Sequence, residues 1–185
     1  MTALRTIVVS LMMTLVLATP IVNADSAVEL DAIIHLSEDD LGIKGIAENP
    51  EKDKILIFGE DGYANIISSK NPESQVLLAA SDNQTMRDAD WHPGGGTALL
   101  VGDEGMILRF AADDYSLTQA GEKMNFGQTD LNAVAWNTAG SWAYVGTEEG
   151  QIWRMRAAED GGAELHALSA SGTSEITAID CHDTI

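Results

Sequence analysis

The fold is decided by a stretch that reads NAVAWNTAGSWAYVGTEEGQIWR, from Asn132 to Arg154. The same pattern occurs upstream as RDADWHPGGGTALLVGDEGMILR, from Arg87 to Arg109. Trp91 and Trp136 are 45 residues apart in the two copies, and Gly102 and Gly146 are 44 residues apart. Copies of one pattern at a nearly fixed period indicate a repeat architecture.

Two weaker copies extend the series. Upstream, Gly59 lies 43 residues before Gly102, within the segment ILIFGEDGYANI. Downstream, Cys181 lies 45 residues after Trp136, within the segment TAIDCHD. The expected repeats are about 43–86, 87–130, 131–174 and a partial repeat 175–185, preceded by a strand at about 28–36.

Each repeat reads as short apolar strands joined by glycine-containing hairpins. A period of 43 to 45 residues with about four strands per repeat is typical of a β-propeller blade. We therefore predict an all-β fold of four-stranded antiparallel blades, about three and a half of them, forming an incomplete propeller. Either a leading strand completes the last blade, or the chain is a fragment or a protomer that closes with another copy. The chain ends just after the first strand of a repeat, which favours truncation.

The repeats resemble a known group of proteins. The segment from Asn132 to Arg154 is similar to repeats of the WD40/YVTN and BNR-like propeller superfamily, and most similar to repeats of photosystem II assembly-factor-like proteins. The Asp-box of such families survives only as its core, Asp160-Gly161-Gly162. The resemblance covers about residues 30–185. It implies the propeller fold and no particular activity.

The first 24 residues have the organisation of an export signal. Arg5 precedes an apolar run at 7–18, Pro20 breaks the run, and Ala24 supplies the small residue of a cleavage site. The run is shorter than the ~20 residues that a bilayer span needs. We expect a signal peptide at 1–24 and a mature repeat domain at 25–185. The mature protein is then exported to the periplasm, the cell surface or the medium, and is not an integral membrane protein.

The charge balance limits the class of partner. The chain has 10 Lys and Arg against 29 Asp and Glu, which gives a formal net charge of -19. Nucleic acid is excluded as the main partner, because its binding needs a basic surface against phosphate. The single cysteine, Cys181, allows no disulfide within the chain. The expected partner is a protein or surface macromolecule, while self-association or further blades beyond Ile185 would complete the ring.

Four residues are candidates for binding a ligand or partner: Trp142, Trp153, Arg109 and Arg154. The two tryptophans either project onto a binding surface, where aromatic side chains contribute much of the affinity, or pack in the core. The two arginines recur at one register of an acidic chain. They either line a pocket for an anionic ligand or pair with nearby carboxylates.

No catalytic residue is assigned. Cys181, His182 and Asp183 hold the groups of a cysteine nucleophile, but adjacent residues of a strand point to opposite faces. The histidines lack zinc spacing, and no phosphate-binding glycine pattern occurs. No cofactor is predicted. Calcium is the alternative, since the hairpins present hard oxygen ligands, and its candidates are Asp103, Glu104, Glu148 and Glu149.

Together these features predict an exported, noncatalytic β-propeller module that binds a protein or other macromolecular partner, in assembly, adhesion or scaffolding. Two alternatives stay open. The chain could form part of a propeller hydrolase or lyase with a site over the central channel, because residues from several blades converge there without any spacing signal. It could also be a structural repeat stabilised by calcium, whose melting temperature would rise with that ion.

Overall fold

The structure is a computed structural model that describes residues 41–78, 83–120, 124, 126–157, 163–168 and 172–182. All of these residues belong to one compact unit, Ile33–Ile185. The predicted signal peptide at 1–24 and the predicted leading strand at 28–36 lie outside the described residues. Within the described ranges, no helix has the length and apolar character to cross a membrane.

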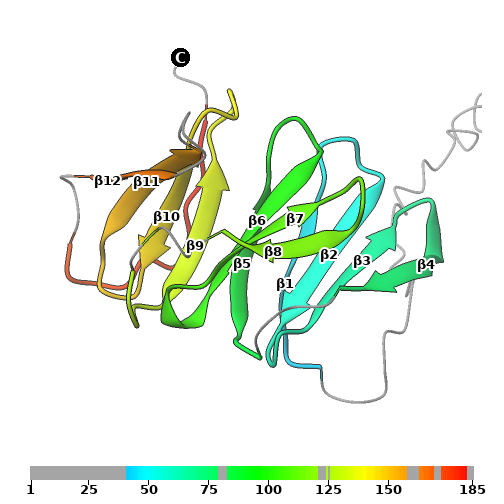
Figure 1. The fold of residues 1–185 in the computed structure, drawn as a ribbon, viewed down its shortest axis with the longest axis horizontal. Helices are drawn as coiled ribbons and strands as arrows, with labels where there is room; N and C mark the ends of the chain where they lie inside the picture. The colour runs from blue at the N-terminus through cyan, green and yellow to red at the C-terminus, as the bar shows by residue number, and fades with distance from the viewer. Residues whose placement is uncertain are drawn as a thin grey trace, which may run out of the picture. The chain divides into compact units, whose positions relative to one another are not determined.

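The described residues form three antiparallel sheets of four strands each (Figure 1). Sheet 1 contains β1 (Ile43–Glu48), β2 (Lys54–Gly59), β3 (Ala64–Ser68) and β4 (Asn71–Leu77). Sheet 2 contains β5 (Met86–Trp91), β6 (Thr97–Gly102), β7 (Ile107–Ala111) and β8 (Ser116–Gln119). Sheet 3 contains β9 (Leu131–Trp136), β10 (Ala143–Thr147), β11 (Ile152–Ala157) and β12 (Ala163–Ala167). Strands follow one another in chain order within each sheet, so the predicted all-β fold of four-stranded antiparallel blades is confirmed.

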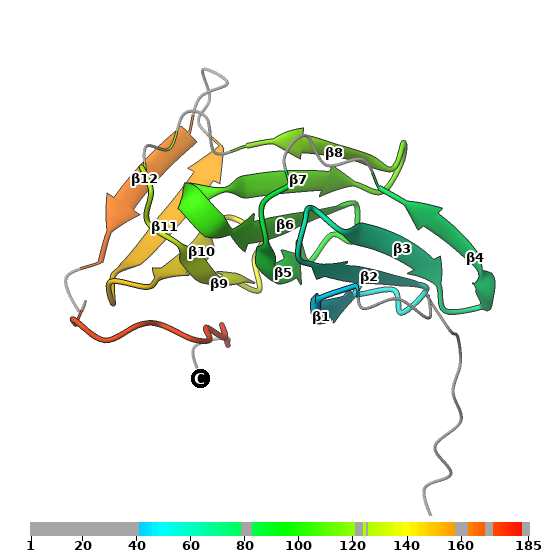
Figure 2. The same ribbon diagram turned by 90° about the horizontal axis from the view of Figure 1, so that it is seen from below.

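The first strand of each sheet is its inner strand. β1 contacts β5, and β5 contacts β9, so the three sheets meet along these strands. Figure 2 shows β1, β5 and β9 in succession, with β4, β8 and β12 at the opposite edges of their sheets. Blades of a propeller are arranged around its axis in this way. The three described sheets are therefore an incomplete propeller.

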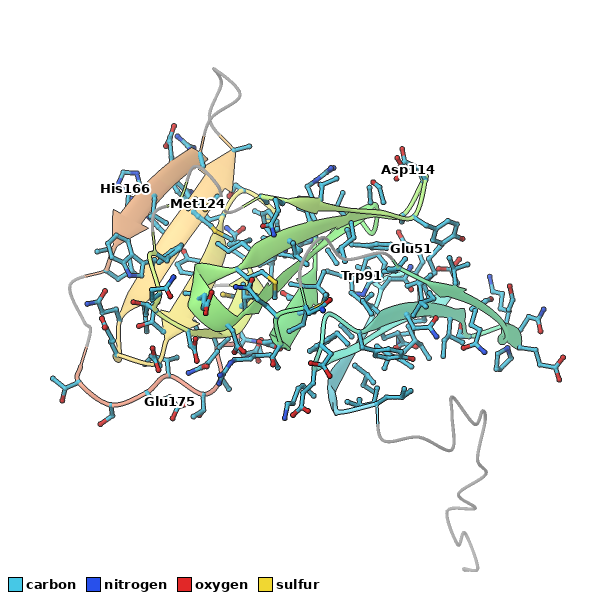
Figure 3. All side chains as sticks on the ribbon, turned by 60° about the horizontal axis from the view of Figure 1, so that its bottom comes forward. Glu51, Trp91, Asp114, Met124, His166 and Glu175 are labelled. Atoms are coloured by element: carbon cyan, nitrogen blue, oxygen red, sulfur yellow. The ribbon has the colours of Figure 1, made fainter. Side chains whose placement is uncertain are left out.

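Consecutive sheets pack face to face. We call the side of a sheet that is turned toward the next sheet in the chain its forward face, and the opposite side its rear face. In sheet 3, the rear face is the side packed against sheet 2, and the forward face is the opposite side. Leu56 and Phe58 on the forward face of sheet 1 form one buried cluster with Trp91 and Phe110 on the rear face of sheet 2. Trp91 is labelled in Figure 3. A second cluster joins sheets 2 and 3 and comprises Leu99, Val101, Ile107, Leu131, Val134, Ala143, Val145 and Met155. Burial of these apolar side chains holds neighbouring sheets together.

The hairpin between the second and third strands repeats in all three sheets. In each, one backbone N–H donates to the carbonyl oxygen four residues later, and the donors are Gly59, Gly102 and Thr147. Thr147 therefore occupies the register of Gly102 in the repeat. The alignment of Gly102 with Gly146, at a spacing of 44 residues, is wrong for the structure. The turn glycines Gly62, Gly105 and Gly150 have φ values of 71°, 71° and 82°. Glycine takes such left-handed conformations without steric cost from a Cβ atom.

Gly146 has a different role, which concerns the C-terminal segment 172–182. This segment lies along sheet 3 without being assigned as a strand, and the N–H of Ile176 donates to the carbonyl oxygen of Thr147 at 3.0 Å (Figure 2). Ile176 and Ile179 approach Gly146 so closely that a Cβ atom there would overlap both side chains. The described part of the predicted partial repeat 175–185 is thus seated on the forward face of sheet 3.

Gly146→Ala is expected to release this segment. The added methyl group would overpack the contact with Ile176, at a cost of about 1–3 kcal/mol. Hydrogen exchange should show faster exchange of the Ile176 amide, while amides of sheet 1 stay protected. Gly96→Ala is the matched control, because no atom lies within 4 Å of a Cβ built at Gly96. Unchanged protection of Ile176 in the Gly146 variant would contradict the proposed seating.

Candidate binding surface

A polar pocket lies where the inner strands of the sheets begin, and we call it the axial pocket. It has a volume of about 420 Å³. Its lining includes Lys44 of β1, Arg87 of β5, Asn132 of β9 and Thr177 of the C-terminal segment. Lys44, Arg87 and Asn132 are each the second residue of an inner strand. Thr177 lies 45 residues after Asn132, as Asn132 lies 45 residues after Arg87, so it occupies the same register of the repeat. The pocket is therefore produced by the repeat architecture, with chemistry set by the residue that each repeat places at this register.

Arg87 is the centre of the polar contacts in the axial pocket. Its guanidinium forms ion pairs with Asp103 and with Asp130, the latter at 2.7 Å, and Nη1 donates to Oδ1 of Asn132 at 3.2 Å. Burial acts against the charged form, but the carboxylates of Asp103, Asp130 and Glu148 outweigh it and raise the pKa of Arg87 above its ordinary value. Arg87 thus joins the inner strand of sheet 2 to that of sheet 3 as a permanent cation.

The remaining charged residues of the pocket, and Asn132, are also paired. Nζ of Lys44 lies 2.5 Å from Oε1 of Glu60, and Nδ2 of Asn132 donates to Oε1 of Glu175 at 3.0 Å. Glu175 and Thr177 are exposed, and Figure 3 shows Glu175 on the C-terminal segment. A surface with such paired, accessible charges can exchange hydrogen bonds with a polar partner at little reorganisation of its own. No short sequence motif marks the axial pocket. Comparing the repeats at the first polar residue of each inner strand would have found it.

Two carboxylates of the inner strand β5 bind the neighbouring strand β9. Oδ2 of Asp88 accepts a hydrogen bond from the N–H of Val134 at 2.8 Å, and Oδ2 of Asp90 accepts one from the N–H of Trp136 at 2.7 Å. β9 is an edge strand of sheet 3, so these N–H groups have no ladder partner. Burial raises the pKa of Asp88 and of Asp90, although the backbone hydrogen bonds act in the opposite direction. Both carboxylates therefore serve to join sheets 2 and 3.

The four residues predicted to bind a partner occupy different settings. Trp142 lies against Arg154, whose Cζ is 4.5 Å from the centroid of the Trp142 ring. Trp153 instead packs edge-on against Phe126 at 5.8 Å, with its Nε1 bonded to Gln151. Arg109 is exposed on the forward face of sheet 2. The structure thus brings Trp142 and Arg154 together and leaves Trp153 and Arg109 apart from them.

The predicted calcium candidates are engaged in contacts within the protein. Asp103 pairs with Arg87, Oε2 of Glu104 accepts from Gln84, and Oε1 of Glu148 accepts from the N–H of Asp130. Glu149 is exposed. Within the part of the chain that the structure describes, no three Asp, Glu, His or Cys side chains are grouped so as to hold a metal ion. Calcium binding stays an untested prediction.

Comparisons with known proteins identify the fold. No family model matches the sequence, and no curated protein matches it. Among solved structures, 369 chains match, so the arrangement is widespread and by itself selects no activity.

One matching structure is the crystal structure of an auxiliary nutrient binding protein from Bacteroides thetaiotaomicron. The TM-score is 0.54 at 13% sequence identity, and the match covers 72% of this chain and 33% of that chain. The present chain thus spans about a third of the length of that protein. At this identity the likeness shows the fold alone.

Proposed function

We propose that this protein is an exported, noncatalytic propeller module of the WD40/YVTN and BNR-like type, which binds a protein or other macromolecular partner in assembly, adhesion or scaffolding. The proposal rests above all on the axial pocket, where Lys44, Arg87, Asn132 and Thr177 present polar groups from successive repeats at one accessible place. A binding role agrees with the description of the Bacteroides neighbour as a nutrient-binding protein. The role does not require a cofactor.

The use of the carboxylates favours binding over catalysis. A propeller hydrolase or lyase would need carboxyl groups with raised pKa values that face a substrate. Asp88 and Asp90 have raised pKa values, but one oxygen of each is bonded to a backbone N–H of β9. The contact between sheets 2 and 3 therefore explains the raised pKa values of these two carboxyl groups. The charged groups that line the axial pocket take part in ion pairs or hydrogen bonds, which suits recognition.

A bulky substitution in the axial pocket tests the proposal. Thr177→Arg is expected to reduce recovery of the cross-linked partner from the producing cells by tenfold or more, because the long side chain would fill part of a pocket of about 420 Å³. Quantitative cross-linking of the tagged, full chain is the measurement. Thr118→Arg is the matched control, since Thr118 is also an exposed threonine but lies on the outer strand β8.

Two results would count against the proposal. Equal recovery of the partner by both threonine variants would move the contact away from the axial pocket. Turnover of a glycan or peptide by the purified protein, lost on Glu60→Gln or Glu175→Gln, would support the enzyme alternative. Mass spectrometry of the exported protein should in addition find Asp25 as its first residue.

A further inference from the structure

A cationic aromatic cluster lies on the forward face of sheet 3, and it consists of Trp142, Arg154, Arg156 and His166. The Cζ atoms of Arg154 and Arg156 each lie 4.5 Å from the centroid of the Trp142 ring. The His166 ring meets the same tryptophan at 5.7 Å, and Figure 3 shows His166 on β12. Tryptophan is the aromatic side chain that attracts cations best. We call these four residues the arginine cluster.

The blade fold does not require this cluster. In sheet 2, the strand pairing places Thr97, Arg109, Ala111 and Thr118 at the registers of Trp142, Arg154, Arg156 and His166, respectively. Three of the four positions are thus small and neutral in the preceding blade. Arg109 is exposed even though sheet 3 covers the inner part of the same face. The register of Arg109 and Arg154 therefore stays open to solvent even when a neighbouring blade packs on the same face. Sheet 3 thus departs from the repeat at positions that a partner can reach.

Charge pairing in the arginine cluster is incomplete. Oε2 of Glu164 accepts from Nε of Arg156 at 2.9 Å and lies 2.8 Å from its Nη2. Arg154 has no carboxylate within ion-pair distance among the described residues, and its buried Nε has no hydrogen-bond partner there. This is unusual in a chain with 29 Asp and Glu and only 10 Lys and Arg. A partly buried guanidinium without an acceptor loses the hydrogen bonds that water would supply.

The geometry selects the kind of group that would pair with Arg154. A guanidinium that stacks on a ring keeps its N–H donors in its own plane, where they match the two oxygens of a carboxylate. The Trp142 ring is already occupied by cations, which disfavours stacking with a sugar. The net charge of -19 repels polyanions at long range, whereas a segment with isolated carboxylates meets mainly the local cations.

We propose that the arginine cluster is a docking site for a polypeptide segment with isolated Asp or Glu side chains, one of which pairs with the guanidinium of Arg154. Arg156 and Glu164 show a guanidinium–carboxylate pair within the protein, in which Nε and Nη2 of Arg156 both approach Oε2 of Glu164. Trp142 orients Arg154 for it. The arginine cluster shares no residue with the lining of the axial pocket, so the inference goes beyond the proposed function and does not depend on it.

Titration of the full chain with a short peptide tests this site. The probe is Gly-Ser-Glu-Ser-Glu-Ser-Gly, the control probe carries Gln in place of Glu, and the readout is the indole N–H signal of Trp142, assigned with Trp142→Phe. The Glu peptide should shift this signal, and Arg154→Gln should weaken binding about tenfold or more. Arg154→Lys should fall between the two, because it keeps the charge without the planar fork. Dispersed signals of the other three tryptophans report that each variant is folded.

A matched variant separates this site from others. Arg109→Gln removes the arginine at the same register of sheet 2, so it should bind the Glu peptide as the unmodified protein does. Equal binding of the Gln peptide, or undiminished binding by Arg154→Gln, would overturn the inference. It would also be overturned if free glutarate bound as tightly as the peptide, since the site would then serve a small carboxylate.

Discussion

Trp91→Ala is expected to lower the free energy of unfolding by about 3–5 kcal/mol. The side chain is 4% exposed, meets Phe110 edge-on at 5.5 Å and donates from Nε1 to the carbonyl oxygen of Ala47 at 3.0 Å. It therefore fills the core between sheets 1 and 2 and also bonds one inner strand to the next. Because stacked repeats depend on such neighbour contacts, its loss should weaken both sheets together. Urea unfolding followed by far-UV circular dichroism measures the effect.

Trp142→Ala is the control for this prediction. Trp142 is only partly buried and the described contacts of its ring are to two arginines and a histidine, so the expected loss is about 1 kcal/mol. A similar loss in the two variants would mean that the cluster between sheets 1 and 2 is not the core that the structure shows.

Asp90→Ala is expected to cost about 1–3 kcal/mol at neutral pH, because it leaves the N–H of Trp136 without its acceptor in a partly buried place. Asp90→Asn keeps an acceptor oxygen and should cost less. The two variants together separate the hydrogen bond from the charge. Urea unfolding at neutral pH measures both, and equal losses would contradict the role of the acceptor oxygen.

The pH dependence of Asp90→Asn has a defined sign. Burial raises the folded-state pKa of Asp90 above the ordinary value of 3.8, so the folded protein binds this proton more tightly than the unfolded chain does. The contribution of Asp90 to stability is greatest below 3.8 and is lost as pH rises through the raised pKa. The stability of Asp90→Asn relative to the unmodified protein should therefore increase with pH over that window. A flat or decreasing difference would contradict the burial of this carboxylate.

The architecture was predictable because it depends on local pattern. Recurrence of the tryptophan at 45 residues, with a turn glycine such as Gly105 or Gly150 in each hairpin, specifies strand lengths and reversals within each repeat. The alignment of Gly102 with Gly146 was wrong because glycine recurs for two reasons. At Gly105 it permits a left-handed turn, whereas at Gly146 it makes room for Ile176.

The binding residues were only partly predictable, because they depend on which strands become neighbours. Trp142 and Arg154 were candidates, but their contact requires the pairing of β10 with β11. Arg156 was missed because it departs from the repeat, since sheet 2 has Ala111 at the same register. Trp153 is of a residue type that is common at binding surfaces, yet its ring lies against Phe126. The two tryptophans differ in the face of the sheet on which they lie, and the strand register decides that face.

The most direct test of the binding role is a photo-cross-linker placed at position 177. p-Benzoylphenylalanine at Thr177 lies at the axial pocket, and the same residue at Thr118 lies on the outer strand of sheet 2. Irradiation of producing cells should give one discrete cross-linked product from position 177 and none from position 118. No product from position 177, or the same product from both positions, would contradict a partner bound at the axial pocket.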